Sequence, residues 1–399
     1  MINPAGIKFS VNFGLFLGIL LVINGCHSTL EKEKQSEIDR IANRWVPDKR
    51  IALCDVTAKT GKGKYIILCG ETTISQAKQD IIKTLNNQGN ILIDSIIILP
   101  DTLRNKKYLG LVTLSVINLR KEPDHASELV SQAILGTPVL ILKETDSWLL
   151  IQTPDNYIAW TEKSSVTPMD FKKLTAWEKT TRVIFLENTG WLFNTASDKS
   201  GVVGDLVGGS IVEKIGESAG YVNVLLPDGR KGFIDKRQVT DLNEWKKSVP
   251  CTEESVCSVA LTYLGLPYLW GGSSTKAVDC SGFVQSVYFR NGLILMRDAS
   301  LQALHGLTVD ISDGFSRLKK GDLLFFGSNN NGTKHVTHVA IYLGNNEYIN
   351  SAGRVMINSF DSTQKNYNSY RLNSLLTAKR IIGLKSEAGI VPVPEHHWY

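Results

Sequence analysis

The sequence predicts a multidomain α+β protein, with a small α/β module near its N-terminus, two small antiparallel β-barrels in the middle and an α+β domain at its C-terminal end. Three patterns carry this prediction. Residues 50–100 alternate apolar, strand-like runs with one helical run. Residues 136–167 align without gaps to residues 209–240, an internal repeat with an offset of 73 residues. Residues 263–344 combine a predicted helix with a predicted β-hairpin.

The composition is that of an ordinary globular chain. Its 399 residues suffice for about two to four domains, and 43% of them are hydrophobic and 21% charged. The net charge of +5 is small for this length, so the charge gives no reason to expect nucleic-acid binding. The sequence contains neither a paired-cysteine zinc pattern nor a phosphate-binding loop pattern.

Residues 1–25 differ from the rest of the chain. Val11–Ile23 is an apolar run that is too short to span a bilayer and has the length of a signal-peptide core. Asn24-Gly25-Cys26 follows directly, and a small residue before cysteine at this place is typical of a bacterial lipoprotein signal. Cleavage would leave a lipid on Cys26, with residues 26–49 as a polar tether in which Glu31–Arg40 could also form a short helix. An ordinary signal peptide or an uncleaved anchor is the alternative.

Export would bring the remaining cysteines into an oxidising compartment. Cys54 and Cys69 flank a Gly-Lys-Gly turn, so they could face each other across a hairpin and form a disulfide. Cys251 and Cys257 are six residues apart at the start of a predicted helix, a spacing that suits a disulfide less well. Four buried thiols are the alternative.

The chain before residue 250 is expected to hold three modules. Residues 50–105 are predicted to form a hairpin, a helix and a strand, and no catalytic motif is found there. Residues 106–170 and 180–242 contain the two copies of the repeat, in which strands of about five residues alternate with turns. Trp148 of the first copy corresponds to Tyr221 of the second, and Trp160 corresponds to Phe233.

The candidate nucleophile lies in Asp279-Cys280-Ser281-Gly282. Phe283, Val284, Val287 and Tyr288 follow with the spacing of one helix face, and Asp279 is a good N-cap residue. Cys280 is therefore expected in the first turn of a helix, where the free N–H groups and the helix dipole would lower the pKa of its thiol. The alternative is a buried structural cysteine.

The candidate base is His338. Leu323–Phe326 and Val339–Leu343 are predicted to be strands joined by a polar turn, which places His338 at the entrance of the second strand. A cysteine at a helix start that faces a histidine on a neighbouring strand is the arrangement of a thiol peptidase. Asn350, on the next predicted strand, could orient the imidazole. His335 is a rival base that the turn is expected to place outside the strand.

Four motifs in this order, PYLWGG, DCSG, GDLLFFG and HVAIYLG, resemble those of the NlpC-type cell-wall cysteine peptidases, whose fold is papain-like. The resemblance covers residues 250–385 and leaves residues 386–399 as a poorly ordered tail. It implies that Cys280 is the nucleophile, His338 the base and Asn350 the third polar residue, at a position where many members carry histidine. It also implies that Tyr268 is the active-site tyrosine, whose hydroxyl could contribute to an oxyanion hole.

The barrels resemble bacterial Src-homology-type (SH3-like) domains, and the two-barrel-plus-peptidase order resembles that of enzymes of murein-peptide recycling. In those enzymes the first barrel packs beside the active site and recognises the free amine of the substrate. The resemblance implies that a buried Glu128 pairs with the ammonium of an N-terminal L-alanine and that Tyr157 lines the same pocket. Further substrate contacts are expected from Asp279, Ser281, Arg297 and Ser300.

These expectations combine into one hypothesis. The protein would be a cysteine endopeptidase, lipid-anchored to the bacterial cell envelope in the periplasm or at the outer membrane. It would hydrolyse the γ-D-glutamyl–L-diamino-acid bond of peptidoglycan stem peptides that have a free N-terminal L-alanine, with diaminopimelate as an example of the diamino acid. The resemblance implies no metal or cofactor, and we expect a monomer. The alternatives are a thiol amidase or acyltransferase on the same scaffold, or an inactive wall-binding lipoprotein.

Overall fold

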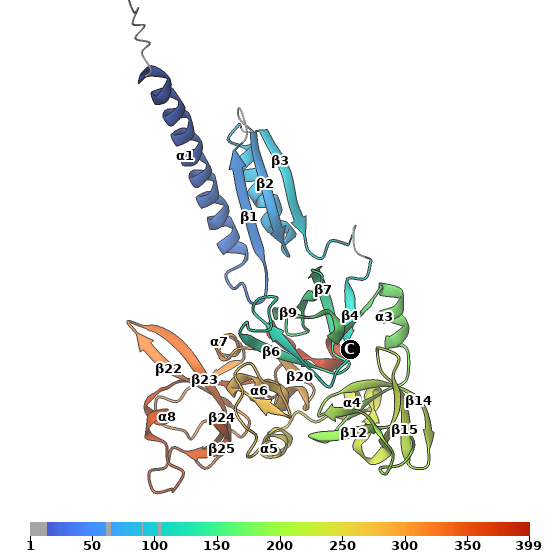
Figure 1. Ribbon diagram of the computed structural model, residues 1–399. Helices are drawn as coiled ribbons and strands as arrows, with labels where there is room; N and C mark the ends of the chain where they lie inside the picture. Colours follow the sequence, from blue (N-terminus) through green and yellow to red (C-terminus); the bar gives the residue numbers. More distant parts are fainter. Residues whose placement is uncertain (1–13, 61–64, 90, 103–105) are drawn as a thin grey trace, which may run out of the picture. The chain divides into compact units, whose positions relative to one another are not determined.

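The computed structural model describes residues 14–60, 65–89, 91–102 and 106–399, and for residues 14–29 it describes the backbone alone (Figure 1). Met1–Leu99 and Pro100–Tyr399 form two compact units. The predicted signal peptide lies largely outside the described residues, and so does the side chain of Cys26. In the parts that are described, no helix has the length and apolar character needed to cross a bilayer.

The N-terminal unit is a three-stranded sheet packed against two helices (Figure 1). The strand order is β1-β2-β3; β1 pairs with β2 antiparallel, and α2 connects β2 to β3, which run parallel. The predicted order of hairpin, helix and strand is therefore found. The bounds are α1 Gly14–Trp45, β1 Cys54–Thr60, β2 Tyr65–Thr72, α2 Ser75–Asn86 and β3 Ile91–Ile98.

In this unit the structure distinguishes between two pairs of alternatives that the sequence leaves open. Most of the predicted tether belongs to α1, because Ile38 and Ile41 are one helical turn apart and are both buried in the core of the unit. Of the two alternatives for Cys54 and Cys69, free thiols are found, since the hairpin register places Cys54 opposite Thr72 and Cys69 opposite Thr57. All five cysteines whose side chains are described are free thiols.

The C-terminal unit begins with two sheets of identical topology. The first has the order β10-β4-β7-β8-β9-β5-β6, and the second has the order β17-β11-β14-β15-β16-β12-β13. The first copy consists of β4 Leu109–Val112, β5 Val116–Arg120, β6 Leu129–Ile134, β7 Pro138–Glu144, β8 Trp148–Gln152, β9 Ile158–Glu162 and β10 Val166–Met169. The second consists of β11 Arg182–Phe185, β12 Thr189–Phe193, β13 Val202–Val207, β14 Ile211–Ser218, β15 Tyr221–Leu225, β16 Lys231–Asp235 and β17 Val239–Asp241.

The repeat extends beyond the segments in which the sequence reveals it. Shifting β5 by 73 residues gives the bounds of β12, and the same shift relates β6 to β13 and β4 to β11. Even the single residue pair that joins β5 to β9, Arg120 with Trp160, recurs as Phe193 with Phe233. The predicted closed barrels are not found in the described part of the chain. Each copy is an open sheet with two edge strands that do not pair with each other.

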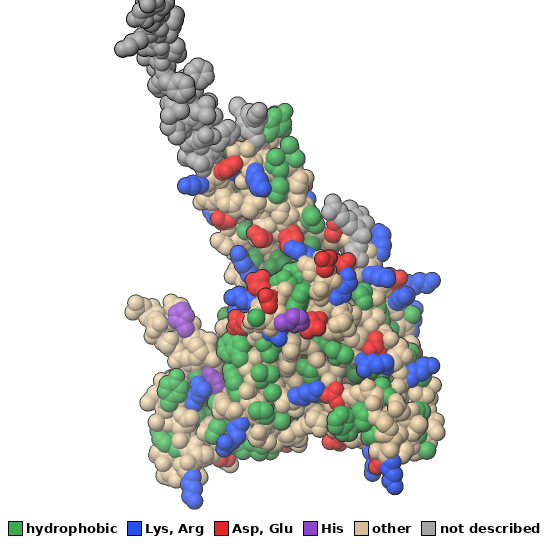
Figure 2. All heavy atoms as spheres, in the orientation of Figure 1, with side chains coloured by type: hydrophobic (Ala, Val, Ile, Leu, Met, Phe, Trp, Pro, Cys, Tyr) green, Lys and Arg blue, Asp and Glu red, His purple; other side chains and the backbone are tan. Residues whose placement is uncertain are grey.

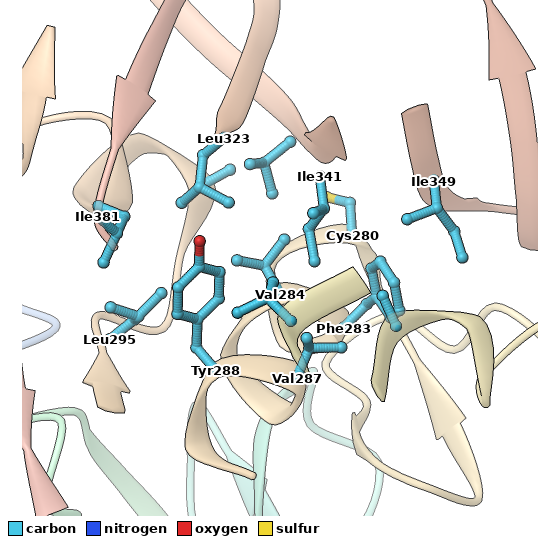
Figure 3. Close-up of a cluster of buried hydrophobic side chains, with 14 of the residues drawn as sticks. Cys280, Phe283, Val284, Val287, Tyr288, Leu295, Leu323, Ile341, Ile349 and Ile381 are labelled. Carbon is cyan, nitrogen blue, oxygen red and sulfur yellow. The ribbon is translucent and has the colours of Figure 1, made fainter. Parts of the chain in front are cut away.

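The remainder of the unit includes a six-stranded sheet with the order β21-β26-β22-β23-β24-β25, in which β21 is Leu307–Val309 and against which α6 packs. Figure 3 shows Val284 and Val287 of α6 beside Ile341 and Ile349 of the sheet, in the cluster that includes Cys280. The elements used below are α6 Cys280–Phe289, α7 Ala299–Gln302, β22 Leu323–Asn330, β23 Thr333–Gly344, β24 Glu347–Ala352, β25 Arg354–Ser359, α8 Ser369–Asn373 and β26 Leu375–Arg380.

The predicted disordered tail is in fact packed. β27 (Ile390–Pro392) pairs antiparallel with β20 (Leu293–Leu295), and the ring of Tyr399 lies 5.9 Å from that of Phe289. The sequence after residue 385 has no hydrophobic periodicity that would predict a strand. The strand is recognised only from its pairing with β20. On the face drawn in Figure 2, Lys and Arg side chains lie among Asp and Glu side chains, in keeping with the small net charge.

Candidate active site

Cys280 is the first residue of α6, as predicted from the capping pattern. The Asp279 side chain accepts a hydrogen bond of 2.7 Å from the backbone N–H of Gly282, which satisfies a free donor of the first turn. Gly282 is required by close packing, because a Cβ there would lie 2.1 Å from the carbonyl oxygen of Gly272. Capping and this close approach together place the sulfur at the helix start.

The predicted lowering of the Cys280 pKa is wrong. The side chain is 8% exposed, and burial raises the pKa of the thiol to about 11, with the nearby Asp279 charge acting in the same direction. A backbone hydrogen bond from Val339 opposes this shift without reversing it. The contact still places the sulfur against β23, at the residue that follows His338.

His338 lies within β23 and not at its entrance. The strand begins at Thr333, and its turn with β22 contains Asn331 and Gly332, both with positive φ. A β-bulge occurs immediately before His338, since His338 pairs with Phe326 while Val336 pairs with Gly327. Such bulges change the direction of side chains near functional sites. The rival His335 is also inside the strand, but its side chain is exposed.

Asn350 orients His338. Ile341 pairs with Ile349 across β23 and β24, so continuing this register puts His338 and Asn350 on one face as diagonal neighbours. The Nε2 of His338 and the Oδ1 of Asn350 are 2.8 Å apart. Asn350 is fully buried, and its Nδ2 donates to the Met356 carbonyl oxygen and to Asn358 Oδ1.

These contacts determine the tautomer of His338. Because the amide nitrogen of Asn350 is occupied by two acceptors, its oxygen must face the imidazole, and an oxygen of this kind only accepts. The Nε2–H of His338 is therefore the donor, and Nδ1 is left as the basic nitrogen. This is the form that a base needs to take a proton from a thiol.

The environment also keeps the imidazole uncharged. Burial lowers the pKa of His338 to about 4, and the positive charge of Arg371 acts in the same direction. The hydrogen bond with Asn350 raises this pKa and does not offset the other two causes. Thiol and imidazole are thus both neutral in the resting site at neutral pH.

Tyr268 lies close enough to respond to the charge of Cys280. Its backbone N–H donates to the Gly353 carbonyl oxygen over 3.0 Å, which holds the segment against the loop after β24. Burial raises the pKa of the phenol to about 12, and the Cys280 and Asp279 charges add to the effect. The hydroxyl therefore remains a hydrogen-bond donor under ordinary conditions.

Three of the predicted substrate contacts are bound to one another instead. Arg297 is 1% exposed, and its Nη2 lies 2.6 Å from Asp279 Oδ2. Its Nη1 donates to Ser281 Oγ over 3.0 Å, and its Nε donates to Ser131 Oγ of the first copy over 3.0 Å. The Gly271 N–H donates to the same Asp279 carboxylate. The structure thus gives Asp279, Ser281 and Arg297 a supporting position under the helix start.

The first sheet copy approaches this position through β6. The Trp270 Nε1–H donates to Glu128 Oε1 over 2.9 Å, and the Ser273 N–H donates to Gln132 Oε1 over 3.1 Å. A Cβ at Gly271 would lie 2.5 Å from the Leu129 carbonyl oxygen, so the glycine is what permits this approach. Glu128 is exposed, contrary to the prediction that it is buried.

The other two predicted contacts, Tyr157 and Ser300, remain predictions, and the phenol of Tyr157 interacts electrostatically with Arg297. Tyr157 is 5% exposed and belongs to the apolar core of the first copy. Ser300 is half-buried in the short helix α7. Sequence reasoning missed three residues of the site, Trp270, Asn358 and Arg371. Only Trp270 carries a signal in the sequence, as an aromatic residue directly before the Gly-Gly pair of a quoted motif.

Comparisons with known proteins agree with this geometry. The sequence profile of the NlpC/P60 family matches residues 265–376, and that of the bacterial dipeptidyl-peptidase Sh3 domain matches residues 119–166. Dipeptidyl-peptidase 6 of Lysinibacillus sphaericus is 28% identical over 270 residues, which cover 65% of this chain and 94% of that protein. The γ-D-glutamyl-L-lysine dipeptidyl-peptidase of Bacillus cereus is 29% identical over 238 residues, which cover 57% and 68%.

A solved structure shows the same fold. An NlpC/P60 family protein from Bacillus cereus superimposes with a TM-score of 0.59 and 22% identity, over 68% of this chain and 99% of that one. It supports the papain-like arrangement of helix and sheet around Cys280. The motifs, the domain matches and this fold together establish that the chain belongs to the NlpC/P60 family and is a cysteine peptidase.

Proposed function

We propose that the protein hydrolyses the γ-D-glutamyl–L-diamino-acid bond of peptidoglycan stem peptides and that it requires a free N-terminal L-alanine. The observation that carries this proposal is the contact of Glu128 with Trp270. It brings a carboxylate of the first sheet copy beside the segment that leads to Cys280. The name of the Bacillus cereus relative supports the choice of bond.

The chemistry follows from the neutral cysteine–histidine pair. As the Cys280 sulfur attacks the γ-carbonyl carbon, the thiol proton passes to Nδ1 of His338. The resulting imidazolium is stabilised through its Nε2–H by Asn350, and the Tyr268 hydroxyl is a donor for the developing oxyanion. The imidazolium then protonates the leaving amine, which releases the diamino acid and leaves a thioester. Water, deprotonated by His338, hydrolyses the thioester and restores the thiol.

Glu128 would recognise the ammonium of the N-terminal residue. A hydrogen bond to a charged group contributes about 1.5–3 kcal/mol, or roughly tenfold to a hundredfold in affinity. Glu128 is exposed, so we do not assign it the larger energy of a buried, unpaired charge. The adjoining contacts of β6 with Gly271 and Ser273 leave the first copy in the path of a longer N-terminal extension.

The test compares L-Ala-γ-D-Glu-L-Lys with its N-acetylated form at equal concentration. We expect rapid cleavage of the free peptide and little cleavage of the acetylated one. Glu128→Gln should lower kcat/KM for the free peptide by roughly tenfold or more. Glu144→Gln, an equivalent change on β7 of the same copy, should not alter it. Equal rates for the two peptides in the wild type would remove the free-amine requirement and favour an enzyme that trims the intact wall.

Cys280→Ala tests the nucleophile and the alternative of an inactive wall-binding protein. Without the sulfur there is no covalent route, so turnover should fall below about one per cent of wild type. The alanine retains the helix start, which depends on the Asp279 cap, so circular dichroism should be unchanged. If neither the wild type nor Cys280→Ala cuts any of the peptides, the inactive wall-binding protein is favoured.

We further propose that the protein is located in the cell envelope, with a lipid on Cys26. The support is the apolar run that ends at Asn24-Gly25-Cys26, together with a substrate that derives from the wall.

A further inference from the structure

Arg371 is an arginine of the site that has no acidic partner among residues 14–60, 65–89, 91–102 and 106–399 as far as their side chains are described. It lies on α8, and its guanidinium carbon is 5.5 Å from the centre of the Phe326 ring and 5.5 Å from that of Tyr370. The Phe326 ring packs in turn on the imidazole of His338, with ring centres 5.7 Å apart. Two aromatic rings therefore hold the guanidinium one side chain away from the proposed base.

Two other arginines of this domain, one buried and one half-buried, do have carboxylate partners. Arg297 is paired with Asp279 at 2.6 Å, and Arg380 is paired with Asp322 at 2.7 Å. Among the residues that the structure describes, the Arg371 guanidinium has neither an ion pair nor a hydrogen-bond acceptor. Burial lowers the pKa of Arg371, which reflects the cost of holding this charge partly out of water. An anion that enters the site would remove that cost.

The proposed substrate carries a carboxylate on the residue after the scissile bond, and this residue would lie on the Arg371 side of Cys280. The first sheet copy contacts one side of the site, through Glu128 with Trp270, Ser131 with Arg297 and Gln132 with Ser273. The N-terminal alanine would bind on this side of Cys280. Arg371 stacks instead against the strands that carry His338. A peptide that starts at Glu128 and passes Cys280 reaches this second side with the residue after the scissile bond.

We propose that Arg371 binds the α-carboxylate of the leaving diamino acid and makes the enzyme selective for peptides that end at this residue. The inference rests on the function proposed above. The planar guanidinium can present two parallel N–H groups to a carboxylate, and its position over the Phe326 ring holds it beside the site. The substrate would then be held at both ends, by its ammonium at Glu128 and by its carboxylate at Arg371. Because both ends of the substrate are held, the enzyme would select tripeptides over longer peptides.

The experiment measures kcat/KM for L-Ala-γ-D-Glu-L-Lys and for the same peptide with a C-terminal carboxamide. Both are assayed at neutral pH, where His338 stays uncharged because its pKa is about 4. Wild type should prefer the free acid by roughly tenfold to a hundredfold, the range for a hydrogen bond between charged groups. Arg371→Gln should abolish this preference by slowing the free acid alone. Arg237→Gln, at an exposed arginine of the second copy, should retain it.

Each other result has a definite meaning. If wild type cuts the acid and the amide equally well, or if Arg371→Gln slows both by the same factor, the carboxylate contact is wrong while the proposed function stands. If wild type cuts neither peptide, the proposed function itself fails. A third peptide with D-isoglutamine in place of D-Glu lacks the other carboxylate. Loss of the Arg371→Gln effect with that peptide alone would assign Arg371 to the residue before the scissile bond and overturn the proposal.

Discussion

Asp279 and Arg297 form a buried ion pair directly beneath the residue that carries the nucleophilic thiol. Their Oδ2 and Nη2 atoms are 2.6 Å apart, and the side chains are 9% and 1% exposed. Burial alone would lower the pKa of Arg297, but the Asp279 carboxylate raises it above its ordinary value. Because the same carboxylate also caps α6, the pair connects the stability of the domain to the position of Cys280.

Arg297→Met should therefore destabilise the fold more than it changes the chemistry. Removal of one partner leaves the Asp279 charge buried, which costs about 3–5 kcal/mol in the free energy of unfolding. Denaturant unfolding measures this loss. Arg317→Met, which breaks an exposed arginine–aspartate pair, is the control and should change the stability much less because solvent screens the pair. Equal losses for the two variants would contradict a structural role of the buried pair.

Asn350→Ala should lower kcat and also reduce stability. The change leaves the Nε2–H of His338 buried without an acceptor, at a cost of about 1–3 kcal/mol, and frees the ring to take the wrong tautomer or orientation. Asn350→His is the matched variant, since a histidine nitrogen can accept the same hydrogen bond. Steady-state kinetics with the free tripeptide should show recovery for histidine and not for alanine. Full activity of the alanine variant would exclude Asn350 from the positioning of His338.

The pH dependence of kcat/KM should show an unusually low acid limb. An imidazolium cannot accept the thiol proton, so activity is present above the pKa of His338 and is lost as the pH falls through about 4. On the alkaline side, the Cys280 pKa of about 11 predicts no change up to about pH 10. Circular dichroism at each pH separates unfolding from titration. An acid limb centred near 6.5 would contradict the lowered pKa of His338, and a loss of activity well below pH 10 would show that the pair rests as thiolate and imidazolium.

Cys26→Ser tests the proposed lipid anchor. Wild-type protein should sediment with the membrane fraction, because a lipid chain supplies the membrane affinity. The serine variant should be exported and recovered in the soluble fraction, with the same specific activity on the tripeptide. Wild type that is already soluble after signal cleavage would rule out the anchor and leave the peptidase assignment untouched.

The sequence alone determined the features that depend on neighbouring residues. Asp279 caps the helix that begins at Cys280 because a cap and its donor are three residues apart, whatever the rest of the chain does. The repeat could be read from matched positions such as Trp160 and Phe233, because both copies bury the same strand pattern. The pairing of His338 with Asn350 was also predicted, since adjacent strands of one sheet bring residues of matching register together.

Tertiary structure decided everything that depends on distant contacts. Register separated Cys54 from Cys69, and burial reversed the expected direction of the Cys280 pKa. Arg297 and Arg371 are equivalent in a sequence, as arginines near a predicted site. One is 1% exposed and neutralised by Asp279, while the other stacks on Phe326 and has its guanidinium available. Desolvation and ion pairing depend on all surrounding atoms, and only the folded chain brings those atoms together.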